Sequence, residues 1–212
     1  MSFNHLFQLA NESGGTLYLM LFLLLVALTV IIERWRYLAN MYKVGENAIA
    51  ICRSKKIIDK RTLQDFREIH ADYPVLGLLE VAIDGEHDNL DREELSGNLE
   101  EALMHEVPKL DRSLWLLDTI ITLAPLLGLF GTIIGMFNAF SVLGDIQSGI
   151  SQVTGGIAEA LIATASGLVI AMIGLFFFNN LNVKIKEVVH QMETLKVMIL
   201  NRQRLFASNA QA

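Results

Sequence analysis

Little in this sequence provides for covalent chemistry, metal binding or nucleotide binding. Cys52 is the only cysteine, so no disulfide can form within the chain, and the five histidines are scattered rather than placed at ligand spacing. The phosphate-binding patterns GxxxxGKS and GxxxxGKT are absent, and no catalytic triad is apparent. We therefore predict that the protein is not an enzyme, and we expect no cofactor, no metal site and no nucleic acid partner.

Basic residues are missing from two long parts of the chain. None of the 17 Lys and Arg residues lies in residues 1–33 or 113–183; twelve lie in residues 34–112 and five in residues 184–204. Segments rich in Lys and Arg stay on the cytoplasmic side of a membrane. The distribution predicts that residues 33–113 and the C-terminal tail are cytoplasmic, whereas the N-terminus and the loop near residue 145 lie outside.

Three long apolar runs fit this topology. Residues 14–32, 119–144 and 160–182 form runs of 19, 26 and 23 residues in a sequence that is 52% hydrophobic. A helix needs about 20 residues to cross a hydrocarbon core of about 30 Å. We predict an all-α integral membrane protein with three transmembrane helices. The alternative for the first run is a cleaved signal peptide, but no basic residue precedes it and no small-residue cleavage site follows it.

The segment between the first two runs carries its charges in two halves. Its first half, to Arg67, is basic, and the second half is acidic. The basic half lies near the membrane, where anionic lipid favours it, although a solvated helix face explains both halves as well. Apolar residues then recur every three or four positions from Leu95 to Leu117. This stripe predicts one long helix that runs into the second membrane span, bent near Pro108 and capped at its start by Asp88 or Asp91.

Small residues line one face of the second and third spans. They allow close approach of membrane helices, for which lipid supplies no hydrophobic drive. The positions are Gly128, Gly131, Gly135 and Ala139 in the second span and Gly156, Ala160, Ala163, Gly167, Ala171 and Gly174 in the third. Because three helices are too few to enclose a pore, we expect a homo-oligomer with these two helices facing inward. The alternative is that the two stripes pack against each other within one subunit.

One carboxylic acid stands alone in the third apolar region. Glu159 is the only charged side chain in the 37 residues from Ile146 to Asn182. An ionisable group in a membrane helix costs roughly 3 kcal/mol on insertion scales and tends to face a pore, a cavity or a partner. On an ideal helix Glu159 lies about 60° to one side of the small-residue stripe, and Thr164 about 80° to the other. Glu159 could stay protonated in a helix interface, or it could titrate as a proton relay would.

Two segments in these spans resemble a known family. LAPLLGLFGTIIGMFNAF (residues 123–140) and GGIAEALIATASGLVIAMIGLFFFNN (residues 155–180) closely resemble the ExbB/TolQ/MotA proton-channel family, ExbB and TolQ in particular. The patterns APxxGLxGTxxGM and GIAEALxATAxGL are long and have fixed small residues. The resemblance places Glu159, Thr164 and Thr132 on the proton pathway, lining the lumen near an aspartate of a partner helix. The chain departs from the family pattern at Ile134, where Trp is usual, and at Ile173, where Pro is usual, so the third helix should be straighter.

The resemblance also implies partners and a role. It implies a pentamer around a dimer of a single-span ExbD- or TolR-like protein, in a bacterial inner membrane. The proton-motive force would drive a periplasm-spanning TonB- or TolA-like protein, and thus TonB-dependent outer-membrane transport. A TolQ-like subunit of the Tol-Pal envelope-maintenance system is the alternative within the family, and a non-conducting membrane scaffold is the alternative outside it. The single-span partner would supply the counter-group that Glu159 lacks in the sequence.

The expected organisation has seven parts, with three membrane crossings between a periplasmic N-terminus and a cytoplasmic C-terminus. They are a periplasmic N-terminus (1–13), transmembrane helix 1 (14–37), a cytoplasmic helical segment (38–112), transmembrane helix 2 (113–143), a periplasmic loop (144–151), transmembrane helix 3 (152–181) and a cytoplasmic C-terminal tail (182–212).

Overall fold

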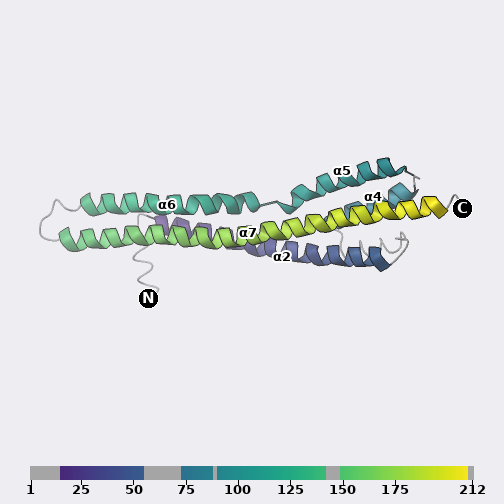
Figure 1. Cartoon of the computed structure of the whole chain (residues 1–212). Coiled ribbons are helices and arrows are strands. Elements are labelled where there is room, and N and C mark those ends of the chain that lie inside the picture. The colour runs from purple at the N-terminus through teal and green to yellow at the C-terminus, as the bar shows by residue number, and fades with distance from the viewer. Residues whose placement is uncertain (1–14, 55–72, 88–89, 142–148, 210–212) are drawn as a thin grey trace. The chain divides into compact units, whose positions relative to one another are not determined.

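The described part of the chain is α-helical. The computed structural model describes residues 15–54, 73–87, 90–141 and 149–209. Over these residues the helices are α2 (Thr16–Ser54), α4 (Pro74–His87), α5 (Arg92–Leu110), α6 (Leu114–Ser141) and α7 (Gly149–Asn209), as labelled in Figure 1. The expected N-terminal segment, residues 55–67 of the basic half, residues 144–148 of the expected loop, and Asp88 lie outside the described residues.

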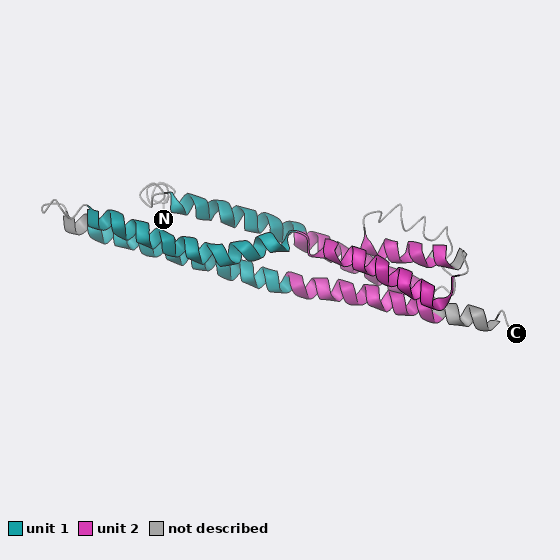
Figure 2. Cartoon of the chain, turned by 90° about the horizontal axis from the view of Figure 1, so that it is seen from above, with its two compact units in different colours: residues 1–33, 113–180 teal, residues 34–112, 181–212 magenta. Residues whose placement is uncertain are grey.

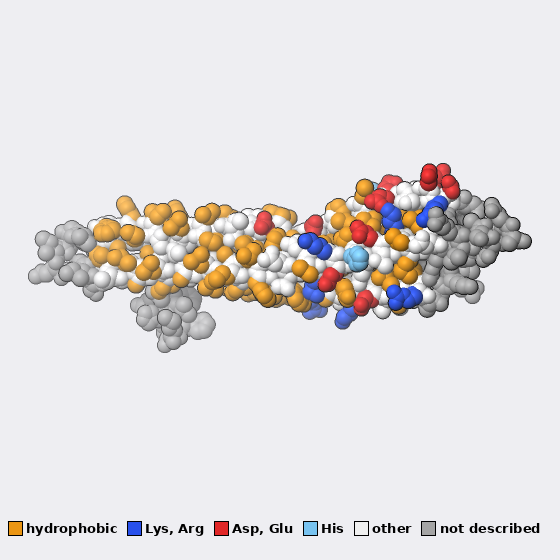
Figure 3. Space-filling view, in the orientation of Figure 1, with side chains coloured by type: hydrophobic (Ala, Val, Ile, Leu, Met, Phe, Trp, Pro, Cys, Tyr) orange, Lys and Arg blue, Asp and Glu red, His pale blue; other side chains and the backbone are white. Residues whose placement is uncertain are grey.

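The chain forms two compact units, coloured separately in Figure 2. Unit 1 consists of Met1–Glu33 and Ser113–Asn180, and unit 2 of Arg34–Arg112 and Leu181–Ala212. The long helices α2 and α7 each contribute residues to both units. In the space-filling view, hydrophobic side chains dominate the visible face of unit 1, whereas most charged side chains lie over unit 2 (Figure 3).

Three stretches of the described chain are long and apolar enough to cross a membrane. They are Thr16–Arg53, Arg92–Ser141 and Val153–Asn201, and their most apolar windows have mean hydropathies of 2.5, 2.1 and 2.4. Only 28%, 22% and 22% of these windows is buried, so most of their residues are partly or fully exposed and can contact lipid or partner helices. The expected all-helical fold with three candidate spans is confirmed at this level.

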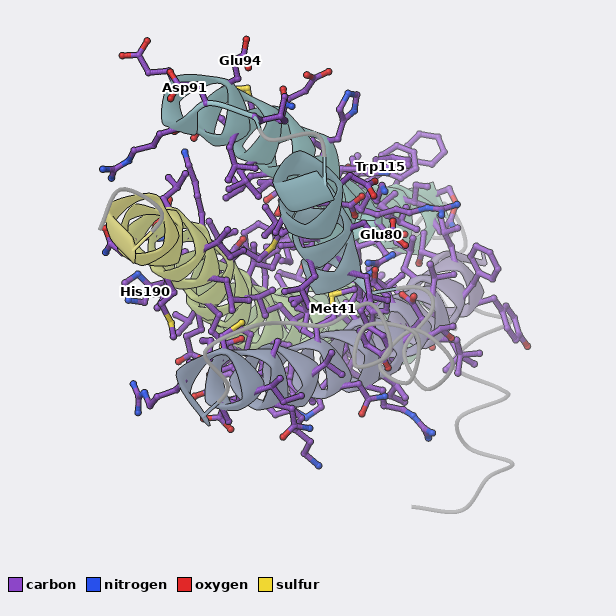
Figure 4. The ribbon with its side chains drawn as sticks, turned by 90° about the vertical axis from the view of Figure 1, so that its right-hand side faces the viewer. Met41, Glu80, Asp91, Glu94, Trp115 and His190 are labelled. Carbon is purple, nitrogen blue, oxygen red and sulfur yellow. The ribbon has the colours of Figure 1, made fainter. Side chains whose placement is uncertain are left out.

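Unit 2 has an apolar core of its own. It includes the antiparallel hairpin of α4 and α5, in which Gly85 lies against Leu95: a Cβ at Gly85 would come within 2.6 Å of the Leu95 Cδ1. The fully buried large side chains of this unit are Leu38, Met41, Leu78, Leu99, Leu110, Leu181, Val188, Met192 and Leu195. Met41 points from α2 into the interior, whereas His190 lies on the outer side of α7 (Figure 4).

Helix α5 begins where an acidic cap was expected. Asp91 has extended backbone angles, its carboxylate accepts a bond from the Arg92 backbone N–H (2.7 Å), and the side chain of Glu94 reaches back to the Asp91 N–H (3.4 Å). This capping box satisfies backbone donors that the first helical turn leaves unpaired. Asp91, one of the two expected candidates, is therefore the cap of α5, and Figure 4 shows Asp91 and Glu94 pointing outward at this end.

The prediction of one long helix from residue 95 into the second span is wrong. Helix α5 contains Pro108, ends at Leu110, and is separated from α6 by a turn at residues 111–113. Ser113 has a φ of 69°, a left-handed conformation that few non-glycine residues adopt and that no α-helix can contain. The leucine stripe is nevertheless largely buried, with Leu95, Leu99, Leu110, Leu114 and Leu117 all in the core. The apolar spacing thus predicted which face of α5 and α6 is buried, but it could not show the break between these helices.

Helix α7 is longer than the predicted span. It runs without interruption for 61 residues and passes through Ile173, where the family pattern has proline. The segment expected as a C-terminal tail therefore continues the same helix to Asn209. Its residues Leu181, Val188, Met192 and Leu195 recur at helical spacing and are buried in unit 2.

Candidate functional site

The small residues of α6 and α7 face each other within unit 1. A Cβ at Gly135 would lie 2.9 Å from the Cβ of Ala160, and one at Gly131 would lie 2.9 Å from the Cβ of Ala163. A Cβ at Gly156 would lie 2.9 Å from that of Ala139. These distances are shorter than methyl groups tolerate, so the absence of side chains lets the two helices approach closely.

The closest approach lies further along the same seam. A Cβ at Gly167 would come within 2.4 Å of the backbone oxygen of Ala124, and one at Gly128 would be 3.0 Å from the Cα of Thr164. Here the obstacle is backbone rather than a flexible side chain. The stripes are thus used within the hairpin of one subunit, which is the alternative left open by the sequence. Ala171, another small residue of the stripe on α7, is half-buried.

Thr164 ties the two helices together through a hydrogen bond. Its hydroxyl donates to the carbonyl oxygen of Gly128 at 3.0 Å, across the hairpin, and the side chain is half-buried. A carbonyl oxygen has two lone pairs and can accept this bond as well as its helical one. Thr164 could reach Gly128 because residue 128 has no side chain to hold the helices apart.

Thr132 behaves differently from Thr164. Its hydroxyl donates to Leu129 of its own helix at 2.6 Å, and Thr122 likewise bonds the carbonyls of Asp118 and Thr119. Such local bonds are the usual state of threonine in a membrane helix. Thr132 and Thr164 therefore lie on the same hairpin, but only Thr164 links its two helices.

Glu159 lies at the edge of this helix contact. It is half-buried and directly precedes Ala160, which is 3% exposed and faces Gly135. Glu159 is thus neither fully buried in the hairpin nor fully exposed. A group in this position can lose or gain a proton if water or a partner helix covers its open side.

Two residues in this interface were not singled out from the sequence. Ala124 supplies the backbone against which Gly167 packs, and Thr16 of α2, 8% exposed, has its hydroxyl oxygen 3.3 Å from the position of a Cβ at Gly131. Ala124 precedes Gly128 by four residues and so continues the stripe, a signal present in the sequence. Nothing in the spacing along α2 indicates Thr16, because its role depends on which helix lies nearby.

The model of the MotA/TolQ/ExbB proton channel family matches residues 55–194, which are 140 of the 212 residues. The chain belongs to this family. Members of the family are transport components and not enzymes, which confirms the prediction that the chain is not an enzyme. The matched range includes Glu159, Thr132 and Thr164. Together with the three candidate spans, family membership makes the chain a multi-pass membrane protein.

Similar proteins carry both names expected within the family. A putative biopolymer transport protein ExbB homolog of Methanothermobacter thermautotrophicus is 28% identical over 189 residues, covering 88% of this chain and 67% of the relative. A putative biopolymer transport protein ExbB-like 3 of Synechocystis is 48% identical over 84 residues (38% of this chain, 40% of the relative). The Tol-Pal system protein TolQ of Haemophilus influenzae is 38% identical over 88 residues (41% and 39%). The chain thus spans about two fifths of the length of the last two relatives.

Proposed function

We propose that the chain is the proton-conducting subunit of an inner-membrane motor that couples the proton-motive force to TonB-dependent outer-membrane transport. The observation that carries this proposal is Glu159, the only charged side chain in residues 146–182, half-buried beside a tightly packed helix hairpin. Family membership supports proton conduction, and the position of Glu159 supports that residue as the carrier. Thr164 and Thr132 complete the proposed pathway on the same two helices.

The pore requires more than one copy of the chain. The hairpin uses its small residues internally, yet both of its helices still expose large apolar side chains. On α6, Leu126, Ile133 and Phe137 are 60%, 60% and 73% exposed. We propose that neighbouring copies cover part of this surface in a pentamer, with a single-span ExbD- or TolR-like helix in the lumen. That helix would bring an acidic group close to Glu159, and the proton would pass between them and water.

The orientation follows from the placement of the basic residues. We propose that the N-terminus is periplasmic and that unit 2, which carries most of the charge, is cytoplasmic. Moving one charge through 100 mV is worth about 2.3 kcal/mol. Several protons in each cycle would therefore supply enough free energy to rotate or pull a TonB- or TolA-like partner that spans the periplasm.

The test is the isosteric substitution Glu159→Gln, which keeps hydrogen bonding but cannot titrate. The matched control is Glu187→Gln, an exposed glutamate further along the same helix α7. Each variant is reconstituted in liposomes with the single-span protein that copurifies with it, and proton uptake is measured under an imposed potential. We expect both variants to assemble with the yield of the parent, as measured by native mass spectrometry, and only Glu159→Gln to lose proton flux.

Two results would count against the proposal. Parental flux in Glu159→Gln would exclude Glu159 as the carrier and favour the non-conducting scaffold. Equal loss of flux in both variants would mean that charge on α7, rather than a proton relay at Glu159, is what matters. Glu159→Asp should retain part of the flux, because the group still titrates and only its reach is shorter.

A TolQ-like role in the Tol-Pal system is the second candidate. It is favoured by two relatives, the TolQ proteins of Haemophilus influenzae and Pseudomonas aeruginosa, which are 38% and 34% identical over 88 and 112 residues. The periplasm-spanning protein that copurifies with the chain in mild detergent separates the two roles. A TonB-like protein supports the first role, and a TolA-like protein supports the second.

A further inference from the structure

A lysine and a tryptophan meet where the apolar parts of α2 and α7 end. The ammonium nitrogen of Lys184 lies 4.8 Å from the centroid of the Trp35 ring, within unit 2. Trp35 follows the apolar run 14–32 by three residues, and Lys184 is the first charged residue after Glu159 along α7. Trp35 is 39% exposed and Lys184 is half-buried. Tryptophan rings and lysine side chains gather at the membrane interface, just beyond the ends of apolar helix segments such as these.

Two other described lysines of unit 2 form ion pairs with glutamates. Lys196 pairs with Glu100, and Lys109 pairs with Glu106. In the described part of the chain, Lys184 has the indole ring as its partner and forms no ion pair with a carboxylate. An aromatic face attracts a cation, but it does not satisfy the three N–H donors of an ammonium group. The ring therefore fixes the position of the charge and leaves its donors available to an anion from outside the chain.

We propose that Lys184 and Trp35 bind the phosphate headgroup of an anionic phospholipid. The ammonium group would donate to the phosphate oxygens, and the indole would lie at headgroup level beside the start of the acyl chains. Lipid is the occupant that the position favours, because the apolar runs of both helices end within a few residues of the pair. The proposal does not depend on proton conduction, and it adds a specific lipid contact to the general attraction of basic segments for anionic membranes.

Trp35 is itself a suitable reporter for this contact. The chain has two tryptophans, and Trp115 is 70% exposed and projects away from the helices (Figure 4). The variant Trp115→Phe therefore leaves Trp35 as the sole tryptophan. Its fluorescence is measured in bilayers that contain equal amounts of either brominated phosphatidylglycerol or brominated phosphatidylcholine, each in an unlabelled phosphatidylcholine background. We expect phosphatidylglycerol to be enriched about fivefold at Trp35 at low salt, which is the enrichment that the attraction of one basic side chain near a membrane surface gives. The enrichment should be smaller at high salt, because salt screens this attraction.

The matched control is Lys186, an exposed lysine two residues further on and about 200° around the helix. Lys184→Gln should abolish the preference for phosphatidylglycerol, whereas Lys186→Gln should keep it. Lys184→Arg preserves the charge and should therefore keep the preference for phosphatidylglycerol. That result would show that the loss in Lys184→Gln is not due to misfolding.

Three results would overturn the proposal. Equal quenching by the two brominated lipids in the parent would exclude an anionic lipid at Trp35. A preference that survives in Lys184→Gln would exclude Lys184 as its source. Equal partial losses in the Lys184 and Lys186 variants would show a diffuse attraction of the surface for anionic lipid and no site.

Discussion

Replacing Gly167 by alanine should destabilise the α6–α7 hairpin although it adds only one methyl group. The new Cβ would lie 2.4 Å from the oxygen and 3.1 Å from the carbon of the Ala124 carbonyl group, and 3.3 Å from the Cα of Gly128. These are backbone atoms, so no side-chain rotation relieves the overlap, and the two helices must separate by about 1 Å. Such a gap removes up to about half of the dispersion energy of each contact between α6 and α7. We expect the free energy of unfolding to fall by about 3 kcal/mol, which is at the upper end of the range for overpacked cores.

Gly155 on the same helix provides the matched control. A Cβ there would have no neighbour within 4 Å, so Gly155→Ala changes helix propensity without changing packing. Alanine gains up to about 1 kcal/mol over glycine in a helix, and both variants receive this gain. The two variants should therefore differ by about 3 kcal/mol, or by about 6–12 °C in melting temperature for a chain of this length.

The assay is survival of the detergent-purified protein after heating. Each variant is heated to a series of temperatures, and the fraction that remains monodisperse is measured by size-exclusion chromatography with tryptophan detection. If Gly167→Ala survives to the same temperature as Gly155→Ala, the helices do not approach at Ala124 as closely as the structure shows, and the argument fails.

Three further predictions concern the hydrogen bonds, the helix cap and the topology. Thr164→Val should lower the free energy of unfolding by about 0.6 kcal/mol, a typical value for an interhelical hydrogen bond in a membrane. Thr132→Val should leave it nearly unchanged, because the hydrogen bond of Thr132 stays within α6. Equal melting temperatures of the two variants would contradict this. Asp91→Ala should lower the free energy of unfolding of unit 2 by about 1 kcal/mol through loss of the α5 cap, and denaturant unfolding followed by circular dichroism measures it. On a cysteine-free background, a cysteine at Ser148 should react with an impermeant maleimide on intact cells and one at Ser208 only after permeabilisation, and the reverse pattern would overturn the proposed orientation.

Much of the membrane architecture could be predicted from the sequence. Apolar runs of sufficient length indicate spans whatever their neighbours are, because backbone groups in lipid must be hydrogen-bonded within their own helix. The cap of α5 was also readable, since Asp91 and Glu94 stand at the spacing of a capping box. Both signals are local, and neither requires knowledge of which helices pack together.

The break between α5 and α6 could not be predicted in the same way. The leucine spacing continues through residues 111–113, and the left-handed backbone of Ser113 has no glycine to mark it. The prediction placed the bend near Pro108, yet α5 continues past this proline to Leu110. A conformation that serine seldom adopts persists only where surrounding contacts fix it.

By itself, the sequence determined the helical class, the three apolar spans and the isolation of Glu159 among uncharged residues, because these depend on the composition of each segment. Only the tertiary structure decided that the small residues of α6 and α7 pack against each other, that Thr164 bonds across this contact while Thr132 bonds within its helix, and that Lys184 lies over Trp35. The reason is physical: a stripe of small residues or a hydroxyl group can be satisfied equally by the same helix, by its neighbour or by another subunit. The choice among these partners is made by the packing of helices that are far apart in sequence.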